Sequence, residues 1–346
     1  MSTSAVSVLM PIGRIDDYIA PAVCSILQQQ QVDVELIVAG PRESSEDFST
    51  LVALLREHFG DDSRIVCIAR TNPGIAGALN NAMTRASCDY IARMDADDIA
   101  EPMRLVQQLE LAKRHDNACL VSTCVDIFSS DRSIQRGNQL YQRWLNEQQS
   151  ANAIRTSCFV ESPLPHPTWF AHKNIWQRVG SYQQGDFPED YDFVLRAWLL
   201  KIPMIKPKDL LLHWREHESR LTRTDTRYRR EAFTQCKAKT LVNPMSGLNL
   251  HEGRRVWIAG TGRNARYWHD ALVSNNAEVA GFVDLDGPNA KQQKRHKPVI
   301  SYQQLANQQK NDLLVTAITA PDARNQLQIW CAEQGLHLGT DVVLGG

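Results

Sequence analysis

The chain has 346 residues, a formal net charge of −1, 43% hydrophobic residues and 22% charged residues. Its length corresponds to roughly two domains of about 150 residues each. The composition is typical of folded proteins and argues against extensive disorder. Because positive and negative charges nearly balance, no basic field indicates a nucleic-acid partner.

The sequence predicts neither a membrane-spanning helix nor a disulfide framework. No apolar run approaches the roughly 20 residues that cross a bilayer. The N-terminal stretch MSTSAVSVLMPIGR has no basic segment before its short apolar run, so we interpret VSVLM as a strand and not as part of a signal peptide. The eight cysteines form no CxxC pair, which argues against a zinc site or a disulfide framework. We expect a cytoplasmic protein with reduced thiols.

The first part of the chain alternates between expected strands and helices. Apolar runs and their spacing predict strands at 6–10, 34–39, 64–69 and 90–94, and helices at 16–29, 48–59 and 77–86. This order predicts an α/β fold with an open, mainly parallel sheet covered by helices on both faces. Ligands of such sheets bind beyond the carboxyl ends of the strands.

The remaining elements indicate a second α/β unit. We expect a helix at 102–115, a strand at 120–128, and helices around 141–148, at 189–200 and at 220–239. Asn243, Pro244 and Gly247 mark a boundary. Strands follow at 256–259, 279–283 and 313–318, with helices at 264–274 and 323–334. The predicted domains are 1–222, a basic helical connector at 223–250, and 251–346.

The stretch YIARMDADDIA, residues 90–100, ends an apolar strand in three carboxylates, Asp95, Asp97 and Asp98. Carboxylates one residue apart at a strand end can hold a divalent cation through hard oxygen ligands. Such a cation can neutralise a diphosphate and stabilise it as a leaving group. Alternatively, Asp98 caps a following helix, since carboxylates are favoured at a helix N-terminus.

Six segments around this stretch occur together in a specific order. They are VSVLMP at 6–11, NPGIAGALNNAM at 72–83, YIARMDADDIAEPMRLVQQL at 90–109, HPTWFAHKNIWQRVGSY at 166–182, EDYDFVLRAWL at 189–199 and WREHESRLTR at 214–223. In this order they resemble the inverting, GT-A fold glycosyltransferases of family 2. The resemblance covers about residues 5–225 and implies transfer of a sugar from a nucleotide-diphosphate donor to a hydroxyl of a glycan or lipid-linked acceptor. It also implies a place in bacterial surface polysaccharide biosynthesis.

The resemblance assigns a donor site. Asp95 would contact the ribose, Asp97 would bind Mn²⁺ or Mg²⁺ at the diphosphate, and Asp98 would support Asp97 or cap the helix. His217 would be a further metal ligand, since imidazole suits such ions tolerably. The other donor-binding residues would be Pro11 at the base, Asn80 near the nucleoside, Arg93, and Arg215 on phosphate oxygens. For Asn80, a capping or packing role is the alternative.

The resemblance also assigns a catalytic base. In a direct displacement the acceptor hydroxyl loses its proton as it attacks, so a carboxylate must lie within hydrogen-bond reach. The pair Glu189-Asp190 matches the base position of the family, and we assign the base to Asp190, with Glu189 as the alternative. Both could instead only cap their helix. His166 lies in the segment expected on the acceptor side.

One segment departs from the family pattern. Where the family commonly has a DDGS-like turn whose aspartate binds the base, residues 39–47 read AGPRESSED. Glu43 could substitute for that aspartate. A UDP-sugar is the first expectation for the donor, and GDP- and dTDP-sugars stay open. A non-catalytic scaffold or sensor that binds nucleotide sugar is the alternative function.

The last unit carries its own motif, GTGRNA at 260–265. Gly260 and Gly262 would bring backbone N–H groups close to a phosphate, and Asp284 ends the next strand where a ribose-binding acid belongs. With GFVDLDG at 281–287 and PVIS at 298–301, this unit resembles the small Rossmann-like N-terminal domains of bacterial sugar acyltransferases. It would bind a nucleotide, pack on the transferase or form a homo-oligomer. An oxidoreductase is a third reading, with NAD binding that Gly262→Val abolishes.

The arginine-rich connector allows two interpretations. It could contact anionic lipid headgroups or a lipid-linked acceptor at the inner face of the membrane. More commonly, such a run is a solvated helix face.

Overall fold

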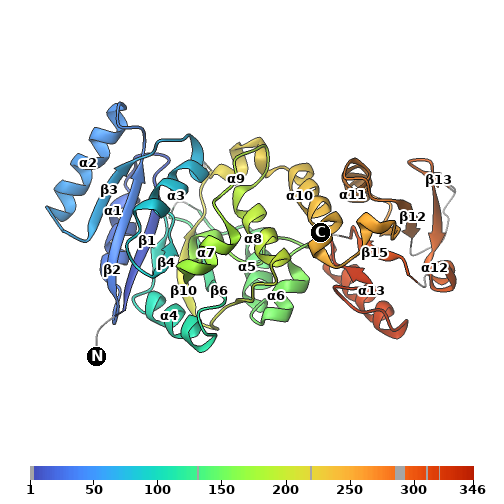
Figure 1. The fold of residues 1–346 in the computed structure, drawn as a ribbon. Coiled ribbons are helices and arrows are strands. Elements are labelled where there is room, and N and C mark those ends of the chain that lie inside the picture. The colour runs from blue at the N-terminus through green and yellow to red at the C-terminus, as the bar shows by residue number, and fades with distance from the viewer. Residues whose placement is uncertain (1–3, 131, 219, 285–292, 309–310, 319) are drawn as a thin grey trace. The chain divides into compact units, whose positions relative to one another are not determined.

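The computed structural model describes residues 4–346 except 131, 219, 285–292, 309–310 and 319 (Figure 1). The contacts between residues divide the chain into two compact units. The first unit contains Met1–Arg155, Pro163–Gly185 and Lys201–Thr224. The second unit contains Thr156–Ser162, Asp186–Leu200 and Asp225–Gly346. Each unit is built around its own sheet.

The main sheet of the first unit has seven strands in the order β3-β2-β1-β4-β8-β6-β9. Their bounds are β1 (Ala5–Pro11), β2 (Asp33–Gly40), β3 (Ile65–Ala69), β4 (Tyr90–Arg93), β6 (Leu120–Val121), β8 (Phe170–His172) and β9 (Met204–Ile205). The first four of these strands in chain order pair in parallel, and β8 is antiparallel to β4 and β6. The predicted mainly parallel sheet is therefore confirmed.

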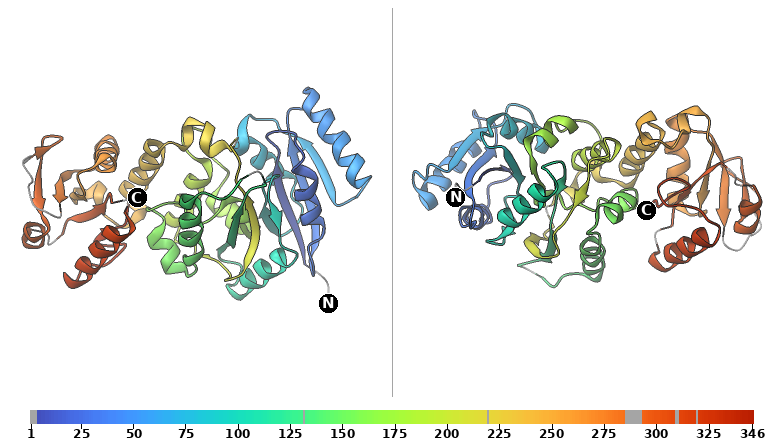
Figure 2. Two further views of the ribbon diagram at one scale, coloured as in Figure 1. Left: turned by 180° about the vertical axis from the view of Figure 1, so that it is seen from behind. Right: turned by 60° about the horizontal axis from the view of Figure 1, so that its bottom comes forward.

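Helices cover both faces of this sheet, and Figure 2 shows them from two further directions. They are α1 (Ile19–Leu27), α2 (Glu46–Phe59), α3 (Gly74–Arg85), α4 (Arg104–Arg114) and α7 (Lys173–Val179). Two further helices, α5 (Arg136–Glu147) and α6 (Ala151–Ser157), follow α4 in the chain. One face buries every second residue of β1, Val6, Val8 and Met10, in the same core cluster as residues of α1, α2 and α4. The intervening Leu9 is equally buried. Burial on both faces explains why the strand is a continuous apolar run.

A second, three-stranded sheet brings distant segments of the first unit together. Its order is β5-β10-β7, with β5 (Ile99–Ala100), β7 (Cys124–Phe128) and β10 (Leu210–Arg215). The prediction of one strand at 120–128 is wrong, because β6 and β7 belong to different sheets. The chain leaves the main sheet at residues 122–123, between β6 and β7. There the hydroxyl of Ser122 forms a hydrogen bond with that of Thr168 at 2.5 Å.

The second unit contains a six-stranded sheet in the order β13-β14-β12-β11-β15-β16. The strands are β11 (Val256–Ala259), β12 (Val279–Asp284), β13 (Gln293–Lys294), β14 (Lys297–Ser301), β15 (Leu313–Thr316) and β16 (Val342–Val343). The helices of this unit are α8 (Glu189–Leu199), α10 (Arg230–Val242), α11 (Arg263–Ser274), α12 (Tyr302–Gln308) and α13 (Pro321–Glu333). Trp257 and Val283 face a core shared with α12 and α13. Phe282 precedes Val283 in β12 and therefore points to the other face of the sheet, where His269 of α11 stacks on its ring.

The basic connector packs more closely than a solvated helix. After the short helix α9 (Leu221–Thr224), α10 contacts both α8 and α11. Phe233 of α10 meets Tyr191 of α8 with ring centroids 5.0 Å apart. Lys237 is 3% exposed, and its Nζ donates to the carbonyl oxygen of Val160 at 3.0 Å. For this face of α10, the interpretation as a solvated surface is wrong.

Two further observations concern domain boundaries and membranes. The contacts place α8 in the second unit, whereas the sequence motifs group it with the first 222 residues; the predicted boundaries at 222 and 250 stay a prediction. Within the part of the chain that the structure describes, no helix is both long enough and apolar enough for a membrane span.

Candidate active site

Three carboxylates cluster at the carboxyl end of β4. Asp95, Asp97 and Asp98 each offer an oxygen, and these oxygens all lie within 4.8 Å of one another. The three carboxylates therefore lie at the carboxyl-end edge of the parallel strands, where ligands of such folds bind. Three negative charges at this spacing repel one another unless cations or protons balance them. Their individual partners show how the structure does this.

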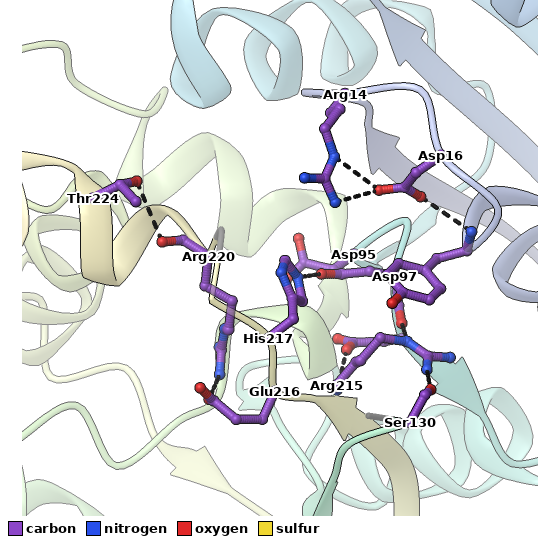
Figure 3. A network of polar contacts seen from close by, with 12 residues as sticks. Arg14, Asp16, Asp95, Asp97, Ser130, Arg215, Glu216, His217, Arg220 and Thr224 are labelled. Carbon is purple, nitrogen blue, oxygen red and sulfur yellow. Dashed lines mark hydrogen bonds and ion pairs between the residues drawn. The ribbon is translucent and has the colours of Figure 1, made fainter. Parts of the chain in front are cut away.

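Asp97 is paired with a histidine that lies 120 residues further along the chain. The Nε2 atom of His217 lies 2.7 Å from Asp97 Oδ2, as Figure 3 shows. The two residues meet because β10, which precedes His217, pairs antiparallel with β5, which follows Asp98. Burial favours the neutral acid, but His217 and Arg220 outweigh it and lower the pKa of Asp97. Asp97 is therefore held as a carboxylate.

Asp98 is fully buried. Its Oδ1 accepts the backbone N–H of Arg215 at 2.8 Å, while its Oδ2 has no hydrogen-bond partner among the described residues. Burial, reinforced by Asp97 and Asp95, raises its pKa well above the ordinary value. The helix-cap alternative is wrong, because residues 99–100 form β5 and α4 begins only at Arg104. A buried carboxylate oxygen without a donor, beside two more carboxylates, is an arrangement that a cation would satisfy.

Asp95 is paired with the arginine that ends β4. Arg93 Nη2 lies 2.5 Å from Asp95 Oδ1, and the Arg93 side chain is almost fully buried. Burial raises the pKa of Asp95 and Asp97 adds to this, against the opposing effect of Arg93. Behind this pair, Arg104 donates to the backbone carbonyls of Arg93 and Pro167 at 2.5 and 2.8 Å. Burial lowers the pKa of Arg104 to about 9.

Arg215 is held by several structural contacts. Its Nε donates to the carbonyl oxygen of Asp97 at 2.7 Å, and Nη1 donates to the hydroxyl of Ser130. Its guanidinium carbon lies 4.2 Å from the ring centroid of Tyr18 and 4.5 Å from that of Phe128. Figure 3 shows this arginine beneath the carboxylates. In this structure Arg215 fastens the loop after β4.

Glu216 gathers arginines beside the cluster. It is buried, lies 2.9 Å from Arg220 and 3.8 Å from Arg132, and also pairs with Arg223. Arg220 in turn lies over the ring of Trp214 at 4.4 Å. Sequence reasoning did not single out Arg132 or the ring of Tyr18, because neither lies in a motif. Only the fold brings Arg132 to Glu216 and Tyr18 to Arg215.

Two other expected residues meet the same tyrosine. The side-chain amide of Asn80 donates to the carbonyl oxygen of Tyr182 at 2.8 Å and accepts its backbone N–H at 2.9 Å. His166 is buried, and its Nε2 lies 2.9 Å from the Tyr182 hydroxyl. Burial, with a contribution from Arg93, lowers the pKa of His166 well below its ordinary value. These contacts favour packing roles for Asn80 and His166.

The residues expected near the nucleobase lie at the ends of β1 and β2. Pro11 is buried as the last residue of β1. Glu43 is exposed in the loop after β2. In the same loop, Ser45 caps α2 by accepting the backbone N–H of Asp47 at 3.1 Å. The AGPRESSED segment thus ends in an ordinary helix start.

The carboxylate pair Glu189-Asp190 opens α8 in the second unit. Glu189 is 1% exposed, and its two carboxylate oxygens lie 2.9 and 3.0 Å from the hydroxyl of Tyr228. Asp190 is half-buried, and its Oδ1 accepts the backbone N–H of Tyr191 at 2.7 Å. Of the two carboxylates, Asp190 is the more accessible.

The GTGRNA turn has the geometry that the sequence predicts. Gly260 adopts φ +106°, which favours glycine, and Gly262 is the N-cap residue of α11. The hydroxyl of Thr261 donates to Asp284 Oδ2 at 2.8 Å, so this acid is engaged by the turn itself. Residues 285–287 of the GFVDLDG stretch lie outside the described residues. A nucleotide site here stays a prediction.

The chain resembles known proteins in both sequence and fold. Residues 7–171 match the family model described as glycosyl transferase family 2. The chain is 28% identical over 241 residues to the O-antigen biosynthesis glycosyltransferase WbnJ of Escherichia coli, a match that covers 68% of this chain and 87% of the relative. It is 29% identical over 141 residues to the amylovoran biosynthesis glycosyltransferase AmsE of Erwinia amylovora, covering 41% of this chain and 50% of the relative. Among solved structures, its fold is similar to S. aureus TarS 1-349 in complex with UDP-GlcNAc, with a TM-score of 0.50 and 13% identity over 78% of this chain and 71% of that chain.

Proposed function

The chain belongs to glycosyl transferase family 2 through residues 7–171, and from this membership we propose that it is a metal-dependent inverting glycosyltransferase. It would move a sugar from a nucleotide-diphosphate donor to a hydroxyl of a glycan or lipid-linked acceptor. The observation that carries the proposal is the cluster of Asp95, Asp97 and Asp98 with His217 at the carboxyl end of β4. Three carboxylates whose oxygens lie within 4.8 Å repel one another, and a bound cation would offset that repulsion.

The side chains of this cluster fit Mn²⁺ or Mg²⁺ as ligands. Asp97 and His217 would hold the cation, with Asp98 behind them and Asp95 on the ribose. Carboxylate oxygens suit both ions, and one imidazole suits Mn²⁺ better. When bound, the cation would neutralise the diphosphate as it leaves. Asp97 is already held in its charged form, which is the form that binds a metal.

We assign proton transfer to Asp190. The acceptor hydroxyl attacks the anomeric carbon, its proton passes to the Asp190 carboxylate, and the bond from carbon to phosphate oxygen breaks. The nucleoside diphosphate then leaves with the electron pair. Glu189 is the weaker candidate because it is 1% exposed and its oxygens face Tyr228. A base must reach the proton that it removes.

The names of relatives support the proposed biological setting. WbnJ is named for O-antigen biosynthesis and AmsE for amylovoran biosynthesis, which supports a role for this chain in surface polysaccharide assembly. The similar TarS structure holds UDP-GlcNAc, which supports a UDP-sugar as the first donor to test. GDP- and dTDP-sugars belong in the same panel.

The deciding experiment is donor binding and transfer with purified protein. UDP-, GDP- and dTDP-sugars are titrated with Mn²⁺ and with EDTA, for wild type and Asp97→Ala. We expect one donor to bind with Mn²⁺ and to lose at least about 100-fold in affinity in the variant, because a charged ligand beside a diphosphate is gone. If donor affinity changes neither with EDTA nor in Asp97→Ala, whichever donor binds, the result would contradict the metal role.

A non-catalytic nucleotide-sugar scaffold is the second candidate. It is favoured by the AGPRESSED segment, where Glu43 is exposed and no aspartate ends β2. This candidate predicts metal-dependent donor binding with neither hydrolysis nor transfer. Slow donor hydrolysis that Asp190→Asn removes would exclude it.

A further inference from the structure

A tyrosine outside the family motifs contacts the carboxylate pair of α8. Tyr228 ends the 3₁₀ turn Thr226–Tyr228, and its hydroxyl lies 2.9 Å from Glu189 Oε1 and 3.0 Å from Oε2. The hydroxyl hydrogen of Tyr228 is thus shared between both oxygens of Glu189, whose exposed fraction is 1%. An ionised carboxylate removed from water needs such a donor, because burial alone favours its neutral form.

The neighbouring arginine supports the same carboxylate. Arg227 Nη1 lies 3.9 Å from Glu189 Oε2. Arg227 is itself fastened by Asp225, whose Oδ2 accepts from Nε and Nη2 at 3.0 and 2.7 Å. The Asp225 side chain also accepts the backbone N–H of Arg227 at 2.9 Å, which caps the turn. The turn therefore presents one hydroxyl and one cation to Glu189 in a fixed geometry.

The Tyr228 hydroxyl stays a donor at any working pH. Burial raises the pKa of Tyr228, and the carboxylates of Asp190 and Glu189 raise it further. A phenol with a raised pKa stays protonated near neutral pH, so its hydroxyl can donate to Glu189. Other charged or titratable groups packed around this first turn are Tyr191 and Asp192 of α8, Cys236 and Lys237 of α10, and Glu161.

We propose that Tyr228 is a positioning residue for the catalytic base. By donating to Glu189 it keeps that carboxylate ionised and holds the first turn of α8, and thereby orients Asp190. An ionised Glu189 next in sequence also strengthens the proton affinity of Asp190, because a like charge disfavours the charged form of its neighbour. This role rests on the proposed function, in which Asp190 takes the proton.

A purely structural role for Tyr228 makes different predictions. Tyr191 shows what such a role looks like: its hydroxyl donates to the carbonyl oxygen of Cys158 and not to a carboxylate. Removing a structural hydroxyl lowers thermal stability and leaves the pH dependence of the rate unchanged. Removing the Tyr228 hydroxyl would change that pH dependence.

The test compares wild type with Tyr228→Phe in the full chain. We expect kcat to fall about 10- to 100-fold, since a hydrogen bond to a charged group is lost, while donor KM changes less than about twofold. The acid limb of the pH–rate profile, which reports the ionisation of Asp190, should move to lower pH, because a neutral Glu189 no longer disfavours the charged form of Asp190. Tyr302→Phe is the control: that buried ring packs against Trp330 in the same unit, with centroids 4.9 Å apart, and its variant should keep kcat.

A double-mutant cycle makes the outcome decisive. If Tyr228 acts through Glu189, Tyr228→Phe should cause no further loss of kcat in a Glu189→Gln background. Full kcat in Tyr228→Phe, an unmoved acid limb, or losses that add in the double variant would each overturn the positioning role while transfer by wild type stands. A wild type that transfers no sugar with any donor would overturn the proposed function, and this role with it.

Discussion

The two carboxylate groups of this protein, one in each unit, consist of the same residue types in opposite surroundings. Asp95 pairs with Arg93, Asp97 lies against His217, and one oxygen of Asp98 has no hydrogen-bond partner among the described residues. Glu189 and Asp190 open a helix, and the buried member faces a tyrosine hydroxyl. Burial and mutual repulsion raise the pKa of Asp95 and Asp98, and a cation would relieve that repulsion, whereas Glu189 already has a hydroxyl donor and Arg227 nearby. On this difference we base the proposals of a metal site at the first group and a catalytic base at the second.

The largest expected effect is a loss of kcat without a loss of donor affinity when the proposed base, Asp190, is replaced. Asp190→Asn should lower kcat about 10²- to 10⁴-fold, as loss of a general base does, with donor affinity in Mn²⁺ unchanged. The matched control is Asp192→Asn, on the same turn of α8, whose carboxylate pairs with Arg196 at 2.8 Å. Steady-state kinetics and donor titration measure both. Equal rate losses in the two variants would mean that general helix electrostatics, and not a base, sets the rate.

The next effect tests whether His217 belongs to the metal or only to Asp97. His217→Ala should weaken Mn²⁺ binding about 10- to 100-fold, the range for loss of a ligand or of its oriented partner. Titration of Mn²⁺ in the presence of donor measures this. As a control, His213→Ala removes the histidine that lies between Glu101 and Asp126, 2.6 and 3.3 Å away. Unchanged Mn²⁺ affinity in His217→Ala would limit His217 to charge pairing.

A pH effect on stability is expected in the second unit. Burial lowers the pKa of Lys237 from its ordinary 10.5 to about 8. Between these values the unfolded chain binds the proton and the folded chain does not, so the free energy of unfolding rises with pH from about 8 to about 10.5. The total is on the order of 3 kcal/mol. Urea unfolding of wild type and Lys237→Met across this range should show a rise in wild type that the variant lacks; parallel curves would contradict it.

The smallest effect concerns Asn80. If its amide serves the backbone of Tyr182, Asn80→Ala should lower the free energy of unfolding by about 1–3 kcal/mol and leave donor affinity unchanged. Asn81→Ala is the control, since Asn81 bonds the carbonyl oxygen of Ala69 at 2.6 Å. A loss of donor affinity in Asn80→Ala alone would restore Asn80 to the donor site.

Local patterns in the sequence predicted much of the fold. The alternation of apolar runs and helical spacing placed β1 to β4 with their helices, and also β11, β12 and β15. Such patterns encode which segments form buried strands and amphipathic helices, and the alternation of these elements indicates the fold class. The split of 120–128 into β6 and β7 was missed, because both pieces are apolar and nothing local marks the change of sheet.

Of the candidate site, the sequence by itself determined that Asp95, Asp97 and Asp98 end a central strand, because strand and cluster are contiguous in the chain. It also determined that Glu189 and Asp190 open a helix. Only the tertiary structure decided that His217 meets Asp97, that Asp98 serves Arg215 and not a helix, and that Glu189 is buried against Tyr228 while Asp190 is not. These are contacts between segments tens of residues apart, and they depend on strand pairing and side-chain packing, which local periodicity does not specify.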